Sequence, residues 1–228
     1  GISTASQISL AYNSICARLS DGTVNCFNGS FSGIYFTNAV QVSSGFIYHC
    51  AVLSDGAVNC WGYNSNGQLG NGSTTTSYTP VSVSGISNAT QVSAGWDHAC
   101  ARLSDSTVKC WGIGDSYQLG NGSTSDQSTP VSVTGINDAL SIYSGDDYTC
   151  VLRNSGNNKC WGQIIGNSRG DALYMQLTPR QVSGISNATQ VSAGSSHSCA
   201  RLSDSTVKCW GHNGNGQLGD NSETSRIT

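Results

Sequence analysis

Residues 90–112 read TQVSAGWDHACARLSDSTVKCWG, and residues 189–211 repeat this stretch with changes at only three positions. Weaker copies start at Ser6, Val40 and Leu140, and the first cysteines of successive copies are 34, 50, 50 and 49 residues apart. Self-similarity at this period, with short apolar runs between glycine turns, predicts a propeller or a solenoid. We therefore expect one domain over residues 1–228, with repeats at approximately 6–39, 40–89, 90–139, 140–188 and 189–228.

The third repeat illustrates the secondary structure expected in each unit. Val, Ile, Leu and Thr alternate there with small or polar residues, which predicts four short strands at Gln91–Ala94, His98–Leu103, Thr107–Trp111 and Pro130–Val133. Gly and Asn clusters separate these runs, and no stretch of the chain sustains the period of a helix. The expected fold class is all-β.

Ten cysteines form five pairs, and the two members of every pair are ten residues apart. Zinc sites usually need four ligands and close cysteine pairs, so the spacing favours disulfides over a metal site. Only local pairing explains five identical spacings, which predicts the bridges Cys16–Cys26, Cys50–Cys60, Cys100–Cys110, Cys150–Cys160 and Cys199–Cys209. If Cys16 faces Cys26, Leu19 faces Thr23 and a three-residue turn ends at Gly22. So many disulfides in a short chain predict a secreted or cell-surface location.

The composition excludes several classes of partner. Charged residues make up 10% of the chain and the net charge is −3, so we expect no nucleic-acid partner. No run of 18 apolar residues occurs, so we expect no membrane insertion. The chain opens without a charged and apolar leader, and it is expected to be soluble with any signal peptide already removed.

Three recurring motifs point to a known family. The third repeat contains Ala94-Gly95-Trp96-Asp97-His98, then Trp111-Gly112, then Tyr117-Gln118-Leu119-Gly120. Cleaner copies of the last motif are Gly67-Gln68-Leu69-Gly70 and Gly216-Gln217-Leu218-Gly219. Over nearly its whole length the chain resembles the regulator-of-chromosome-condensation repeat family. The resemblance implies a β-propeller of four-stranded antiparallel blades, usually seven, and the repeats here indicate about five, each with one disulfide inside the blade.

Two departures from the family pattern concern the first and last repeats. The first has Phe27 in place of Trp and lacks the Gly-Gln-Leu-Gly loop, so its blade is expected to be stunted. The last repeat stops where a fourth strand starts elsewhere, while the opening Gly1-Ile2-Ser3 matches Gly85-Ile86-Ser87. We therefore expect the two chain ends to meet at one blade that lacks a strand, the seam. Either five blades close with this incomplete seam, or the sequence is a piece of a longer chain.

The strand order also predicts where ligands bind. Successive connections of an antiparallel meander alternate between its two ends, so the two residues after Ala-Gly share a face with the long loop after Trp-Gly. These pairs vary between repeats while the opposite face is nearly constant, and loops on a rigid scaffold are where binding sites usually lie. The alternative is sequence drift in unconstrained loops. The candidate ligand-binding residues of this loop face are Tyr12, Phe46, Tyr48, Trp96, Asp97, Asp146 and Asp147.

Other polar residues are expected to have structural roles. His49, His98 and His197 are expected to share one packing position of the repeat rather than to act as metal ligands or bases. The Ser-Asp turns lie at the far end of each blade from the loop face, so no catalytic residue is predicted, and no phosphate-binding loop or other cofactor site is found. Five sequons are candidate N-glycosylation sites, at Asn28, Asn71, Asn88, Asn121 and Asn187.

The leading hypothesis is a non-enzymatic extracellular binding or adhesion module that recognises a glycan or a protein surface through the loop face. Aromatic rings stack on sugar faces, and small polar groups pair with sugar hydroxyls. One alternative is a structural subunit of an extracellular assembly, in which a partner's strand pairs with an open edge and the chain can self-associate. Another is a protein inhibitor of a hydrolase. The nucleotide-exchange role that the resemblance implies is disfavoured by the disulfides and the acidic balance.

Overall fold

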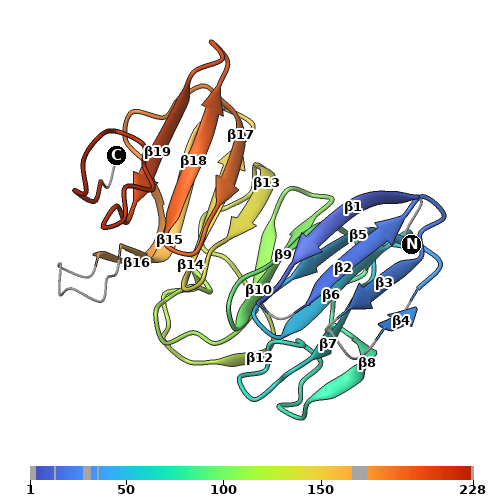
Figure 1. Ribbon diagram of the computed structural model, residues 1–228. Helices are drawn as coiled ribbons and strands as arrows, with labels where there is room; N and C mark the ends of the chain where they lie inside the picture. Colours follow the sequence, from blue (N-terminus) through green and yellow to red (C-terminus); the bar gives the residue numbers. More distant parts are fainter. Residues whose placement is uncertain (1–3, 13, 28–31, 35, 166–173, 227–228) are drawn as a thin grey trace.

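The computed structural model describes residues 4–12, 14–27, 32–34, 36–165 and 174–226. The strands fall into five antiparallel sheets that follow one another in chain order (Figure 1). Four sheets have four strands and the fifth has three. The chain is an all-β propeller of five blades, as the repeats predict.

Each blade is a meander in which strands adjacent in sequence are adjacent in the sheet. Blade 1 contains β1 (Ala5–Leu10), β2 (Ile15–Leu19), β3 (Val24–Phe27) and β4 (Ser32–Ile34). Blade 2 contains β5 (Ala39–Ser44), β6 (Tyr48–Leu53), β7 (Val58–Gly62) and β8 (Ser77–Ser82). Blade 3 contains β9 (Ala89–Ala94), β10 (His98–Leu103), β11 (Val108–Gly112) and β12 (Gln127–Ser132). Blade 4 contains β13 (Ala139–Ser144), β14 (Tyr148–Arg153), β15 (Asn158–Ile165) and β16 (Tyr174–Gln181), and blade 5 contains β17 (Ala188–Ala193), β18 (His197–Leu202) and β19 (Val207–Gly211).

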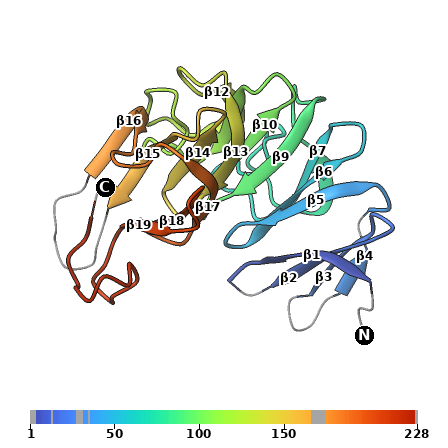
Figure 2. The same ribbon diagram turned by 90° about the horizontal axis from the view of Figure 1, so that it is seen from above.

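The blades lie along an arc, with blade 1 and blade 5 at its two ends (Figure 2). The first strand of each blade contacts the first strand of the next, so β1, β5, β9, β13 and β17 line the inner side. The prediction that the chain ends meet at one blade is wrong. Blade 1 supplies its own inner strand, and in blade 5 Arg226 returns to pair with Gly211, so each blade is built from its own repeat.

The central hairpin of every blade has the predicted register. Cys100 lies opposite Cys110 in the β10–β11 pair, and the cysteines of the other four blades are paired in the same way, with bonded sulfurs. The Leu19 amide donates to the Thr23 carbonyl at 2.8 Å, and Gly22 adopts a φ of 83°. Ser106 and Ser205 occupy the equivalent position with φ values of 65° and 69°, a conformation that normally favours glycine.

The apolar core lies between adjacent blades, and the family motifs build it. Trp111 of blade 3 is buried against the second blade's Gly-Gln-Leu-Gly loop, and its indole N–H donates to the Gln68 carbonyl at 2.9 Å. A Cβ atom on Gly70 would lie 2.8 Å from this indole, which explains the glycine. Blade 1 is stunted as predicted, because β4 has three residues while β8 has six.

Side chains of the inner strands also join successive blades through hydrogen bonds of one glutamine and one serine. We call this set of contacts the glutamine clamp. In blades 1 to 3 a glutamine amide both donates to and accepts from one backbone position of the next inner strand, at 2.7–3.0 Å. A serine two residues later accepts a further amide at 2.8–3.0 Å. The pairs are Gln7 with Val42, Gln41 with Val92 and Gln91 with Ile142 for glutamine, and Ser9 with Ser44, Ser43 with Ala94 and Ser93 with Ser144 for serine.

Candidate binding site on the loop face

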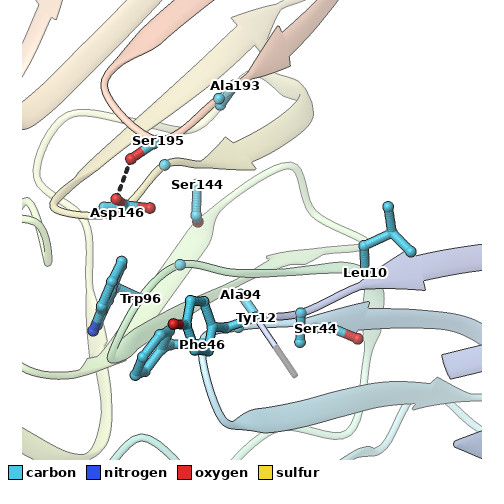
Figure 3. A pocket seen from close by; sticks show the side chains of 15 residues that line it. Leu10, Tyr12, Ser44, Phe46, Ala94, Trp96, Ser144, Asp146, Ala193 and Ser195 are labelled. Atoms are coloured by element: carbon cyan, nitrogen blue, oxygen red, sulfur yellow. Dashed lines mark hydrogen bonds between the residues drawn. The ribbon is translucent and has the colours of Figure 1, made fainter. Parts of the chain in front are cut away.

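The five short loops converge on one open pocket of about 400 Å³ at the inner edge of the blades (Figure 3). Each blade contributes the last residue of its inner strand and the two residues after it, and the second of these two is Tyr12, Phe46, Trp96, Asp146 or Ser195. Backbone hydrogen bonds link four of them, from Phe46 N to Trp96 O at 3.2 Å, from Trp96 N to Asp146 O at 3.2 Å and from Asp146 N to Ser195 O at 2.9 Å. These bonds make the rim a continuous belt rather than a set of independent loops.

One side of the pocket is aromatic. The rings of Phe46 and Trp96 are stacked, with centroids 4.0 Å apart and planes at 14°, and Tyr12 is tilted against Phe46 at 4.9 Å (Figure 3). Trp96 is 40% exposed, whereas the other four tryptophans of the chain are at most 2% exposed. Such an exposed stack adds apolar surface at a place where folding alone does not favour it.

The other side of the pocket is acidic. The Ser195 hydroxyl donates to the Asp146 carboxylate, as Figure 3 shows. Next to it, burial and the charges of Asp146, Asp115 and Asp97 raise the pKa of Asp147 to about 6. In the described part of the chain the two ion pairs are Arg153–Asp138 and Arg226–Asp220, so neither Asp146 nor Asp147 is paired with a cation there.

Asp97, a predicted ligand-binding residue, connects two blades. Its carboxylate accepts hydrogen bonds from the side-chain amides of Gln68 at 2.7 Å and Asn66 at 3.3 Å. Burial raises the pKa of this carboxyl group, although both hydrogen bonds oppose the shift. Asp97 therefore holds the long loop of blade 2 against the short loop of blade 3, beside the pocket rather than in its lining.

Tyr48 does not belong to the loop face, and its prediction as a ligand-binding residue is wrong. Its side chain is fully buried, and its hydroxyl donates to the His98 carbonyl of the next blade. The first residue of the second strand points between blades rather than toward the pocket. Desolvation accordingly raises the pKa of Tyr48 well above its ordinary value.

The histidines do not all share one position. Tyr48, His98, Tyr148 and His197 are equivalent, since each lies opposite the glycine of a Trp-Gly motif, whereas His49 comes one residue later. His49 packs against the first disulfide, with Nδ1 3.3 Å from Cys16 Sγ. A packing role is confirmed for His49 and His98, and burial lowers their pKa values to about 4 and 3. Cys16, Cys26 and His49 lie close enough together to hold a metal ion, but the two cysteine sulfurs are bonded to each other in a disulfide.

The sequon asparagines stabilise turns. The side-chain oxygens of Asn71 and Asn121 accept hydrogen bonds from the backbone amides of Ser73 and Ser123, at 3.1 and 3.0 Å. Asn88 and Asn187 lie exposed on the opposite face and donate to serine hydroxyls at 3.3 and 3.1 Å. Asn28 lies outside the described residues.

Of the five equivalent short-loop residues in the pocket lining, Ser195 is the one that sequence reasoning missed. It occupies the position of Trp96 in the near-identical repeat, so alignment of the repeats was the signal that could have found it. Sequence reasoning also missed the glutamine clamp that holds the inner strands, although the glutamine recurs at one position of four repeats. In the segments that the structure describes, no helix has the length and apolar character needed to cross a membrane.

Comparisons with known proteins identify the scaffold. Two family models, both for the regulator of chromosome condensation (RCC1) repeat, match the chain, one at residues 55–102 and 106–152 and the other at 39–68, 89–118 and 188–217. A search of curated protein sequences found no match.

Three solved structures share the fold over 98% of this chain. Human WBSCR16 has a TM-score of 0.86 at 20% identity, with 65% of that chain covered. Yeast RCC1 (Prp20) bound to Kap60 has a TM-score of 0.84 at 19% identity, with 60% of that chain covered. Prp20p from Saccharomyces cerevisiae has a TM-score of 0.83 at 18% identity, with 62% of that chain covered. The chain thus spans 60–65% of the length of these structures. Because the matched repeats extend over more than half of its residues, the chain belongs to the RCC1 repeat family.

Proposed function

We propose that the chain is a non-enzymatic extracellular binding module that holds a glycan or a protein surface in the loop-face pocket. The observation that carries this proposal is the exposed Phe46–Trp96 stack at the point where all five blades converge. The RCC1-type propeller is a protein-interaction fold, and Prp20p was studied for its binding to Gsp1p and histones. The five disulfides support an oxidising, extracellular setting.

The pocket defines the chemistry of the ligand. The stacked rings offer a flat apolar surface, and the carboxylate of Asp146 offers hydrogen-bond acceptors on the opposite side. Asp147, the next residue of the chain, is half-buried and does not line the pocket. A ligand that fits has a ring or aliphatic face flanked by hydroxyl or amine donors, as a sugar unit or an exposed protein side chain does. Phosphorylated and other anionic ligands are disfavoured by the acidic side.

Trp96→Ser is the most informative variant, because Ser is the residue that the near-identical fifth repeat has at this position. A glycan array and a display library of extracellular proteins would be screened with the wild-type chain, and each hit measured with the variant. Loss of a central aromatic anchor commonly costs about 2 kcal/mol, or roughly thirtyfold in affinity. The matched control is Tyr78→Ser, since Tyr78 is 74% exposed on the outer strand β8.

Fluorescence supplies a second readout, because Trp96 is the exposed tryptophan of this chain. In the wild-type chain, a ligand in the pocket should protect Trp96 from quenching by acrylamide. Binding that survives Trp96→Ser, together with no protection of Trp96 in the wild-type chain, would contradict the proposed site. An unchanged melting temperature in the variant would show that any loss of affinity does not come from unfolding.

A further inference from the structure

Trp96 has one free aromatic face in the loop-face pocket. Phe46 covers the other face of the indole, since the two ring centroids are 4.0 Å apart and the planes are at 14°. The backbone bonds of the belt run from Phe46 to Trp96 and from Trp96 to Asp146, and Figure 3 shows Trp96 between these two residues. The free face therefore lies on the acidic side. The three residues belong to blades 2, 3 and 4, each of which has a neighbouring blade on both sides.

Asp146 is the charged residue of the pocket lining, and half of its carboxylate is available to a ligand. Its Oδ2 atom accepts the hydrogen bond from the Ser195 hydroxyl. Its Oδ1 atom has no hydrogen-bond partner among the described residues. A carboxylate oxygen that is only half-buried, next to a free aromatic face, can accept a donor from a group that stacks on that face.

Asp147 has the same position in blade 4 as Asp97 has in blade 3, but it lacks the partners of Asp97. The Asp97 carboxylate accepts hydrogen bonds from two side-chain amides of the preceding long loop. In the corresponding loop of blade 3, Ser116 replaces one of these amides, and the Gln118 amide donates to Asp115 at 3.4 Å instead. The half-buried carboxyl group of Asp147 thus has no hydrogen-bond donor in the part of the chain that the structure describes.

The basic residues of the hairpins lie at the other end of the blades. Arg102 lies one residue before the end of β10 at the turn, where its Nε donates to the Ala139 carbonyl at 2.7 Å, and Lys109 is close to the same turn. Further arginines and lysines lie in this region of the other hairpins, and these are Arg18, Arg153, Lys159, Arg201 and Lys208. The pocket lining contains no lysine or arginine among its described residues. A positive charge that balances the acidic side therefore has to come from the ligand.

Given that the pocket is the binding site of the proposed function, we propose that it holds the side chain of an arginine on the surface of a partner protein. A guanidinium group is planar and permanently charged, so it stacks on the free face of Trp96 while its N–H groups donate to Asp146. The ammonium group of a lysine or an amino sugar is compact and does not stack in this way. Among the described residues, no three carboxylates lie close enough together to hold a metal ion, so the acidic side suits an extended organic cation.

Two blocked amino acids that differ in charge test the proposal. N-acetyl-arginine-amide and its neutral analogue N-acetyl-citrulline-amide would be titrated into the wild-type chain. The readout is the indole N–H resonance of Trp96, identified by its absence in Trp96→Ser. The arginine compound should bind at least roughly tenfold more tightly, because citrulline stacks but carries no charge. Asp146→Asn should remove most of this preference. Asp55→Asn makes the same charge change in an exposed turn of the opposite face and should keep it.

Arginine binding should also strengthen with pH, through Asp147. Its pKa is raised to about 6 by burial and by three neighbouring carboxylates, those of Asp146, Asp115 and Asp97. The nearby His98 and Tyr148 stay neutral between pH 5 and 7, because burial lowers the pKa of His98 to about 3 and raises that of Tyr148 far above this range. The affinity for the arginine compound should therefore rise roughly threefold from pH 5 to 7, and Asp147→Asn should remove the rise.

The possible failures separate this proposal from the proposed function. Equal binding of the arginine and citrulline compounds, with the Trp96 resonance shifted by both, would overturn the choice of a cation and leave the pocket supported as a binding site. Tighter binding of glucosamine than of the arginine compound would overturn it in favour of a sugar ligand. A Trp96 resonance that neither compound shifts would also overturn it. The proposed function would fall with it only if the hits of the glycan array and the protein library left this resonance unchanged as well.

Discussion

The third and fifth repeats have nearly the same sequence and very different surroundings. Residues 90–112 and 189–211 differ at three positions, yet Val108 is 1% exposed and its counterpart Val207 is 63% exposed. Gln91 is clamped to Ile142 of blade 4, while the equivalent Gln190 is exposed. The burial of a side chain in this fold therefore depends on the neighbouring blade rather than on its own repeat.

A charge introduced at the equivalent valines should show the largest difference between the two repeats. Val108→Asp buries an unpaired carboxylate between blades 3 and 4 and should cost about 3–5 kcal/mol of unfolding free energy. Val207→Asp should cost less than about 0.5 kcal/mol, because the new charge remains in water. Guanidinium unfolding measures both values. Equal losses would show that the two faces are equally buried.

Removal of one disulfide should lower the free energy of unfolding by the same amount in both repeats. The pairs Cys100–Cys110 and Cys199–Cys209 close loops of the same length, with a sequence separation of 10. Replacing either pair with alanine should cost about 3 kcal/mol in the chain-entropy description, because the effect acts on the unfolded chain. Chemical unfolding of the two double variants tests this expectation. A loss confined to blade 3 would mean that native packing dominates instead.

The clamp glutamines should separate the two repeats by a smaller amount. Gln91→Ala removes two hydrogen bonds and leaves backbone groups of Ile142 without a partner, so a loss of about 1–3 kcal/mol is expected. Gln190→Ala should change the free energy of unfolding by less than about 0.5 kcal/mol. Thermal unfolding of the two variants under identical conditions measures both losses of stability. Similar shifts in both would contradict the clamp as the source of the difference.

His98 and its counterpart His197 give the smallest predicted effect, which depends on pH. Burial lowers the pKa of His98 from 6.5 to about 3, so the unfolded chain binds a proton that the native chain does not. Stability should therefore fall as pH drops below 6.5, by about 1 kcal/mol between pH 6.5 and 5.5 for this one group. His98→Tyr introduces the residue that blades 2 and 4 have at this position and should remove that contribution, and His197→Tyr is the matched control. Unfolding curves at the two pH values that show no difference between wild type and His98→Tyr would contradict the assignment.

The sequence allowed the local structure to be predicted because local spacing determines it. A sequence separation of 10 between paired cysteines places Cys100 opposite Cys110, and this register fixes the turn and the faces on which the loops lie. For the same reason Trp96 could be placed on the loop face before the structure was known. Its place in the variable pair of a short loop was sufficient for this prediction, although the stacking of its ring on Phe46 of blade 2 was not predicted.

Contacts between blades could not be predicted in this way. Tyr48 follows a loop residue directly, but its side chain crosses to the His98 carbonyl of the next blade, and only the three-dimensional arrangement reveals this. Asp97 was predicted to contact ligand, and its bonds to Gln68 and Asn66 instead span two blades. The expected meeting of the chain ends was wrong because a one-dimensional repeat does not state how far the arc turns.

Amide hydrogen exchange at Val92 and Val191 tests the role of the neighbouring blade most directly. The two valines are equivalent in the near-identical repeats, and the Val92 amide donates to the Gln41 side chain of the preceding blade at 2.7 Å. The blade before Val191 has Ser141 in place of that glutamine, and the Ser141 hydroxyl bonds to the Tyr143 hydroxyl at 2.7 Å. We predict that Val92 exchanges at least roughly tenfold more slowly than Val191, and that Gln41→Ala removes this difference. Equal exchange rates in the wild-type chain would contradict the claim that the neighbouring blades, and not the repeat itself, determine the environment of each residue.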